Sequence, residues 1–136
     1  MMKEQLLSTL ETSKNYTLAV ASAMPEAQFG FKPATEVWTF AELMSHIAYG
    51  IYWWEENYIR GTESEWNPPV AASDKTEALA RLNAAFGMLE QCVKALKPIT
   101  SELNGLHATL DHITHHRGQA TTYLRCCGIT PPDYAY

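Results

Sequence analysis

The sequence predicts an all-α protein, a four-helix bundle made by a single domain over residues 1–136. Four stretches of the chain carry apolar residues at steps of three and four, which is the period of an amphipathic helix. No sustained alternation of apolar and polar residues indicates a strand. Segments rich in proline and glycine separate the four stretches, each of which is about twenty residues long, as in helix bundles.

The first helix is predicted from Lys3 to Met24, because Pro25 disfavours its continuation. The second helix has the clearest start: Thr39 is a good N-cap, and Glu42 three residues later completes a capping box. It is expected to stop at Gly61. Its apolar stripe comprises Phe40, Leu43, Met44, Ile47, Ile51, Trp54 and Tyr58.

The segment after the second helix is predicted to be a long loop or crossover, because Pro68 and Pro69 disfavour regular structure there. Ser73 or Asp74 is expected to cap the third helix, which Pro98 closes. Its apolar residues form a heptad-like seam: Leu79, Leu82, Phe86, Leu89, Val93 and Leu96.

The fourth helix is predicted to begin between Thr100 and Leu106 and to end at Gly128, before two prolines. Its apolar stripe comprises Leu103, Leu106, Leu110, Ile113, Ala120 and Leu124. Four such helices favour a bundle, and the long second connection allows a crossover. The spacing itself leaves the order and handedness of the helices open.

Charge and hydropathy argue against several classes of partner. The net charge is −5, and the ten basic residues are scattered, so the basic footprint of a nucleic-acid-binding protein is absent. No apolar run is long enough to predict a membrane span. The polar N-terminal stretch does not resemble a signal peptide, so we expect a cytoplasmic protein. Cys126 and Cys127 could bind a soft metal or form a redox pair, although two small residues at a helix end are the simpler interpretation.

Histidines are the most informative residues, because the stretch LDHITHHRGQ holds three of the five in the chain. At 100° per residue, His116 and His112 lie roughly 70° and 110° from the centre of the apolar stripe, on the same flank. His115 lies roughly 170° away and is expected to face solvent or a partner. On the second helix, His46 is also on the flank of its stripe, with Gly50 one turn further along. Gly50 has no side chain and would leave room for an ion, a water molecule or a substrate.

Two helices that each present imidazole at the border of a bundle core could hold one metal ion. Imidazole suits zinc, nickel, copper or iron better than magnesium or calcium. Three protein ligands leave a coordination position open, as in catalytic sites. The alternative is that His112 and His116 form only a polar flank. No His-Glu-x-x-His motif is present, and no carboxylate on the fourth helix has the spacing of a di-iron ligand.

The C-terminal stretch HITHHRGQATTYLRCCGITPP resembles the last-helix motif of the DinB/YfiT-like family. The stretch FKPATEVWTFAELMSHIAYG is similar to the second-helix region of that family, where one histidine follows a Trp and a capping residue. This resemblance implies a four-helix bundle in the order up-down-down-up, with a long crossover between helices two and three. It also implies a divalent metal, commonly nickel or zinc, bound by His46, His112 and His116.

Two functional classes compete. The resemblance implies a metal-dependent hydrolase or a transferase of a low-molecular-weight thiol, in which the metal activates water or the thiol. Trp53 and Tyr123 share the ligand flanks of their helices and could line the substrate pocket with Gly50, or could be core aromatics. Arg117 falls near the apolar stripe, where it could bridge to a carboxylate on another helix or reach the pocket. The second class is a non-catalytic metal-binding or interaction protein, a homodimer that pairs through the aromatic stretch YGIYWWEENY.

Overall fold

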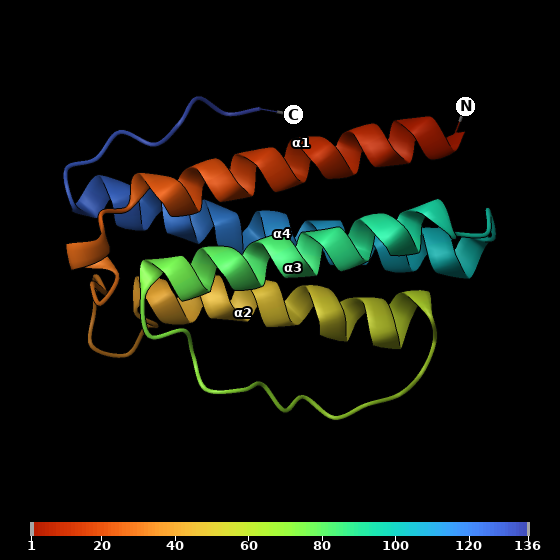
Figure 1. The fold of residues 1–136 in the computed structure, drawn as a ribbon, viewed down its shortest axis with the longest axis horizontal. Coiled ribbons are helices and arrows are strands. Elements are labelled where there is room, and N and C mark those ends of the chain that lie inside the picture. Colours follow the sequence, from red (N-terminus) through yellow and green to blue (C-terminus); the bar gives the residue numbers. More distant parts are fainter. Residues whose placement is uncertain (1, 136) are drawn as a thin grey trace.

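The computed structural model describes residues 2–135 and consists of helices joined by loops. Within these residues there is no strand. Figure 1 shows α1 and α4 running in one direction and α2 and α3 in the other, so the order is up-down-down-up. The elements are α1 (Met2–Ala23), the 3₁₀ turn η1 (Glu26–Gln28), α2 (Phe40–Trp54), the π-helical turn η2 (Glu55–Ile59), α3 (Lys75–Lys94) and α4 (Thr100–Cys126).

The four helices enclose one apolar core. The main contacts of α1 and of α2 are both with α3 and α4, so α1 and α2 lie at opposite corners of the bundle (Figure 1). The largest fully buried side chains come from the predicted apolar stripes of α2, α3 and α4, together with Met24, which follows α1. They are Met24, Phe40, Leu43, Met44, Ile47, Ile51, Leu82, Phe86, Leu89, Leu106, Ile113 and Leu124.

The helix ends follow the signals in the sequence. The capping box is present, because the Thr39 hydroxyl accepts from the backbone N–H of Glu42 at 3.1 Å and the Glu42 carboxylate accepts from the backbone N–H of Thr39 at 3.0 Å. Of the two candidates for the cap of α3, Asp74 occupies the position and accepts from the backbone N–H of Glu77 at 2.8 Å. Gly128 follows α4 with a φ of 75°, a conformation that glycine adopts without strain.

The end of α2 differs from the prediction. Regular α-helix stops at Trp54, and the next five residues form the π turn η2. A π turn adds one residue to the ring of each hydrogen bond and therefore rotates the side chains that follow it. Tyr58, expected in the apolar stripe, is 48% exposed, whereas Ile59 is buried.

The π turn brings the backbone of η2 against α4. A Cβ atom added at Gly105 of α4 would collide with the carbonyl group of Tyr58. Only a residue without a side chain permits this approach. Gly105 therefore sets how closely α4 can pack against the end of α2.

The crossover between η2 and α3 is fastened to the outer surface of α2 (Figure 1). The backbone N–H of Asn67 donates to the Tyr49 hydroxyl at 3.0 Å, and the backbone N–H of Ala72 donates to the Ser45 hydroxyl at 2.9 Å. Because Ser45 and Tyr49 are one turn apart on α2, these two bonds hold the crossover along the helix. No helix among the described residues is long and apolar enough to cross a membrane.

Replacement of Gly105 by alanine is expected to lower the free energy of unfolding by about 1–3 kcal/mol, the usual range for overpacking, because the collision with Tyr58 outweighs the gain in helix propensity. Gly87→Ala in α3 is the matched control, since a Cβ there meets nothing within 4 Å. That variant should be neutral or up to about 1 kcal/mol more stable. Urea unfolding measures both, and equal stabilities for the two variants would contradict the close approach.

Candidate metal centre

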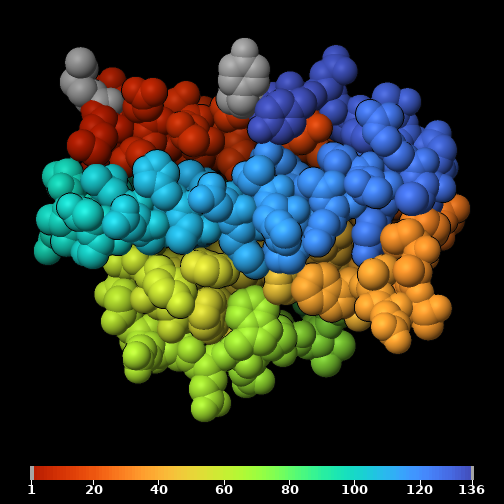
Figure 2. Space-filling view, turned by 180° about the vertical axis from the view of Figure 1, so that it is seen from behind, coloured from red at the N-terminus to blue at the C-terminus, as the bar shows by residue number. Residues whose placement is uncertain are grey.

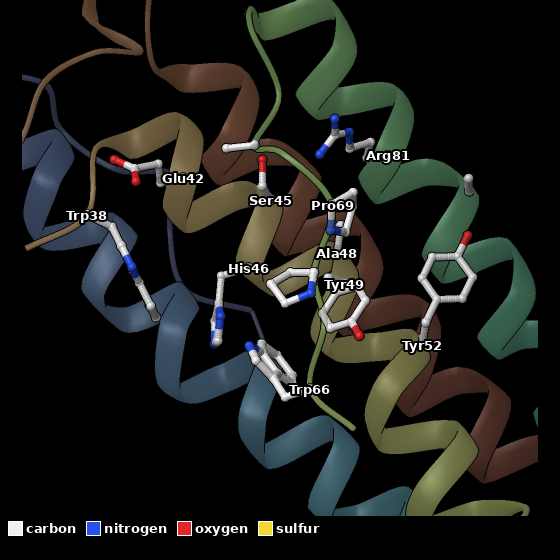
Figure 3. A pocket seen from close by; sticks show the side chains of 13 residues that line it. Trp38, Glu42, Ser45, His46, Ala48, Tyr49, Tyr52, Trp66, Pro69 and Arg81 are labelled. Carbon is white, nitrogen blue, oxygen red and sulfur yellow. The ribbon is translucent and has the colours of Figure 1, made fainter. Parts of the chain in front are cut away.

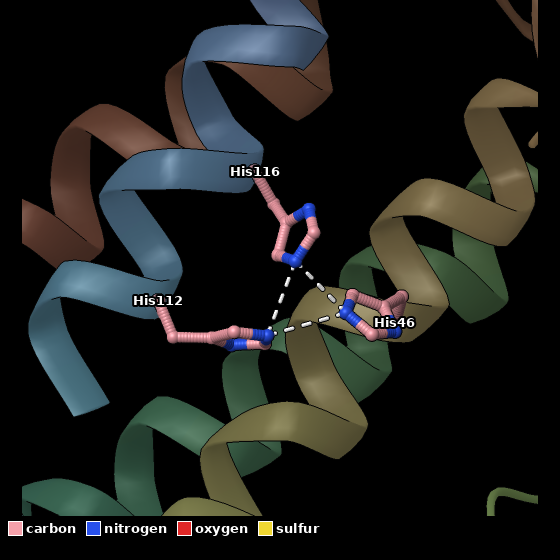
Figure 4. A group of neighbouring side chains, drawn as sticks. All are labelled: His46, His112 and His116. Carbon is pink, nitrogen blue, oxygen red and sulfur yellow. Dashed lines mark hydrogen bonds between the residues drawn. The ribbon is translucent and has the colours of Figure 1, made fainter. Parts of the chain in front are cut away.

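Three histidine side chains converge between α2 and α4 (Figure 4). The Nε2 atom of His46 lies 3.2 Å from that of His112 and 2.9 Å from that of His116. The Nε2 atoms of His112 and His116 are 3.1 Å apart. The three atoms thus form a nearly equilateral triangle, so the three histidines that the helix period placed on the flanks of the two apolar stripes lie next to one another.

The two helices position this triangle in a simple way. His112 and His116 are one turn apart on α4, so their rings lie one above the other on the side that faces α2. His46 reaches them from α2. A Cβ atom on Gly50 would lie 2.5 Å from Cε1 and 2.9 Å from Nδ1 of His112, so the missing side chain of Gly50 makes the space that the His112 ring fills.

A hydrogen bond on α4 orients the His116 ring. His116 Nδ1–H donates to Oε1 of Gln119 at 2.8 Å, one turn further along the helix. With the proton on Nδ1, the Nε2 atom carries a lone pair, as a metal ligand requires. The sequence motif contained Gln119, but its role was not predicted. The i, i+3 spacing from His116 was the available signal.

The surroundings keep the imidazoles neutral. Burial, with the charge of His116 as the next cause, lowers the pKa of His46 from 6.5 to about 4. Burial and the charges of the other histidines likewise lower the pKa of His112 to about 4. Burial also lowers the pKa of His116, against the hydrogen bond with Gln119. Neutral imidazole is the form that binds a metal, so no proton has to be displaced at neutral pH.

The donor set fits a divalent transition metal. Bonds of about 2.0–2.1 Å with ligand angles of about 90° to 110° would separate the ligand nitrogens by roughly 2.9–3.4 Å, which includes all three distances found here. Three lone pairs directed at one point repel each other unless a proton or a cation lies between them. Nδ1 of His112 is buried and has no hydrogen-bond partner among the described residues.

Other candidate ligands lie elsewhere. His115 is exposed and contacts His116 only through their rings, whose centroids are 4.8 Å apart. His115 lies outside the cluster found among residues 2–135, which consists of His46, His112 and His116. Cys126 and Cys127 are free thiols at the end of α4 and are not in the cluster.

A hollow of about 650 Å³ adjoins His46 beneath the crossover. Figure 3 shows Trp38 and Trp66 on either side of the His46 ring, with Tyr49 and Tyr52 further along α2. The ring centroids of Trp38 and Trp66 lie 4.3 and 5.2 Å from that of His46. Most of the lining is apolar, and its charged side chains are Glu42 and Arg81.

Gly50, Trp53 and Tyr123 were considered as possible lining of the pocket, with core aromatics as the alternative for Trp53 and Tyr123; none of the three is in the lining of this hollow. Gly50 is covered by the His112 ring. Trp53 borders a separate hollow beside Glu63 and Glu65 and stacks edge-on against Trp66 at 5.4 Å. Tyr123 borders another hollow, together with Trp38 and Gln119.

Tyr123 contacts the backbone of Trp38, which flanks His46. Its hydroxyl donates to the carbonyl oxygen of Trp38 at 2.8 Å, which holds the Trp38 ring over His46. The predicted carboxylate partner of Arg117 is not found: the ion pairs of the described residues do not include it, and its guanidinium lies over the Tyr16 ring at 4.9 Å. Arg117 therefore faces α1, away from the histidines.

Comparison with known proteins agrees with this architecture. The family model described as the DinB superfamily matches residues 9–120. No curated protein sequence matches the chain significantly. The structure is similar to the crystal structure of a DinB-like protein from Bacillus subtilis, with a TM-score of 0.74 and 17% sequence identity over 96% of each chain. At that identity, the similarity establishes the fold alone.

The lowered pKa values predict how the stability of the metal-free protein depends on pH. Below about 6.5 the unfolded chain binds protons that folded His46 and His112 accept only near pH 4. The free energy of unfolding should therefore fall as the pH is lowered from 7 to 4.5. The double variant His46→Gln, His112→Gln should show a shallower fall in chemical unfolding experiments, whereas His115→Gln should match the wild type. Parallel curves for the wild type and the double variant would refute this assignment.

Proposed function

Because the chain belongs to the DinB superfamily, we propose that it is a divalent-metal-dependent enzyme whose metal is bound by His46, His112 and His116. The observation that carries the proposal is the triangle of Nε2 atoms, with sides of 2.9–3.2 Å, built from two helices. Nickel or zinc is the expected ion, since both accept neutral imidazole.

The proposed reaction class is hydrolysis or transfer of a low-molecular-weight thiol. A divalent ion at this site would supply Lewis-acid chemistry that lowers the pKa of water or of a thiol. The histidines bind the ion, and Gln119 keeps the proton of His116 on Nδ1. Three protein ligands leave a position for the reacting group.

The hollow beside His46 is the proposed substrate site. Its volume of about 650 Å³ is within the usual range for small-molecule sites, about 300–1,000 Å³. Trp38 and Trp66 shield the metal side from water and offer aromatic faces to an apolar part of the substrate. Arg81, although paired with Glu77 at 2.7 Å, keeps further N–H donors for a polar group at the other end.

A non-catalytic metal-binding protein is the second candidate, and one observation favours it. Glu42 is the carboxylate in the lining of the hollow, and it is engaged with the backbone N–H of Thr39 rather than free to act as a general base. In this alternative the exposed rings of Tyr52, Tyr58 and Trp66 would form a homodimer interface. The three free cysteines agree with a cytoplasmic location in either case.

Activity assays separate the two candidates. The metal-loaded protein is screened for hydrolysis of esters and amides and for addition of a low-molecular-weight thiol to an electrophile. The enzyme proposal expects turnover that chelation abolishes and that re-added nickel or zinc restores. Turnover that survives chelation would contradict it, and a loaded but inactive dimer would favour the non-catalytic protein.

Metal content tests the ligand assignment independently of any substrate. His46→Ala and His112→Ala are each expected to abolish stoichiometric binding of nickel or zinc, because two imidazoles do not complete the site. His115→Ala removes an adjacent exposed imidazole and should leave binding nearly intact. Mass spectrometry of untagged protein measures the occupancy, and full occupancy in all three variants would show that the ligands are wrong.

Gly50→Ala tests whether the position of the His112 ring is needed. The added methyl group would lie 2.5 Å from Cε1 of His112, so the ring must move out of the triangle. We expect metal affinity to fall at least tenfold, measured by competition with a chromogenic chelator, with little loss of helix content. Gly118→Ala on α4, where a Cβ meets nothing within 4 Å, is the control and should keep wild-type affinity.

A further inference from the structure

Arg117 is a buried cation on the side of α4 that faces α1. Only 5% of its surface is exposed, and the ion pairs among residues 2–135 do not include it. Its guanidinium lies over the rings of Tyr16 at 4.9 Å and Tyr134 at 5.8 Å, and it has a hydrogen bond with the Tyr134 side chain. Arginine stays charged at physiological pH and has five N–H donors, and within residues 2–135 most of these donors have no protein partner.

A second hollow, of about 710 Å³, lies beside this guanidinium between α1 and α4. In contrast to the hollow at His46, most of its lining is polar. Hydroxyl side chains from both helices line it, together with Arg117 and Tyr134: Ser8, Thr9, Thr12, Ser13 and Thr114. Figure 2 shows α4 lying between α1 on one side and the crossover on the other. The second hollow lies on the α1 side of α4, whereas residues of α2, the crossover and α3 line most of the hollow at His46.

Ser13 gives an independent indication of a missing ligand. Only 8% of the surface of Ser13 is exposed, and its buried hydroxyl has no hydrogen-bond partner among the described residues. A buried hydroxyl without a hydrogen bond is destabilising, and so is a buried guanidinium without an anion, so a ligand that pairs with both groups would remove both costs. Glu4 also lines the hollow, but it is exposed and forms no ion pair with Arg117.

We infer that this hollow binds the oxyanion group, a carboxylate or a phosphate, of a small molecule. The planar fork of Arg117 donates to two oxygens of that group, and the Ser13 hydroxyl donates a further hydrogen bond. The Tyr16 and Tyr134 rings hold the guanidinium in place by cation–π contact. This site is separate from the proposed metal site and does not depend on the proposed activity.

Isothermal titration calorimetry with inorganic phosphate and, separately, with acetate tests the inference. Sodium chloride keeps the ionic strength constant in both titrations. At least one anion should bind saturably with one-to-one stoichiometry. Phosphate alone would identify a phosphorylated ligand, acetate alone a carboxylate. The inference fails if neither anion binds saturably.

Arg117→Gln should weaken binding at least tenfold, and Arg125→Gln, which removes an exposed cation two turns away on the same helix, should not change it. Ser13→Ala is a second test in case Arg117→Gln fails to fold. Removal of an unpaired hydroxyl should not lower the stability of the protein, but it should weaken anion binding several-fold. His46→Ala should bind the anion as the wild type does, which excludes a metal ion as the receptor. Wild-type anion affinity in Arg117→Gln, or loss of binding in His46→Ala, would overturn the assignment.

Discussion

The close packing of α2 against α4 is the constraint on which the rest of the structure depends. Two glycines at this seam make it possible, one on each helix. Gly50 of α2 leaves the volume that the His112 ring occupies, and Gly105 of α4 admits the backbone of Tyr58 at the π turn. A side chain at either position would push the helices or the imidazole apart. The separations of 2.9–3.2 Å between the histidine Nε2 atoms therefore follow from helix packing.

Two loops bring aromatic side chains to His46, which the helices place next to the other histidines. The 3₁₀ turn and loop before α2 carry Trp38, whose carbonyl oxygen is held by the Tyr123 hydroxyl of α4. The crossover carries Trp66 and is tied to Ser45 and Tyr49 of α2. Two indole rings from unrelated segments thus flank His46, and they form one wall of the hollow beneath the crossover. The polar hollow at Arg117 lies on the side of α4 that faces α1, whereas His112 and His116 lie on the side that faces α2.

The fold could be predicted from the sequence because each helix carries local signals. The apolar period, the capping box at Thr39 and Glu42, and the glycine and proline stops are all properties of neighbouring residues. The π turn was missed, because the period of three and four continues through Tyr58 and gives no sign of the inserted residue. The exposure of Tyr58 is the visible consequence.

The candidate site was predictable to the extent that it follows helix geometry. The i, i+4 spacing placed His112 and His116 together, and His46 was found on the flank that faces them. The spacing could not show that an imidazole would occupy the space beside Gly50, because the sequence of one helix does not determine its packing distance from another helix. Trp38, Trp66 and Arg81 were missed as lining residues for a related reason: loops and a third helix bring them to the hollow.

The central claim is that three imidazole nitrogens bind one metal ion and leave a position open. X-ray absorption spectroscopy at the metal edge of the nickel- or zinc-loaded protein tests it most directly. We expect about three histidine nitrogens at about 2.0–2.1 Å with one or more light-atom ligands completing the shell. A sulfur ligand at about 2.3 Å would assign the metal to one of the three cysteines, and a shell without imidazole scattering would contradict the site altogether.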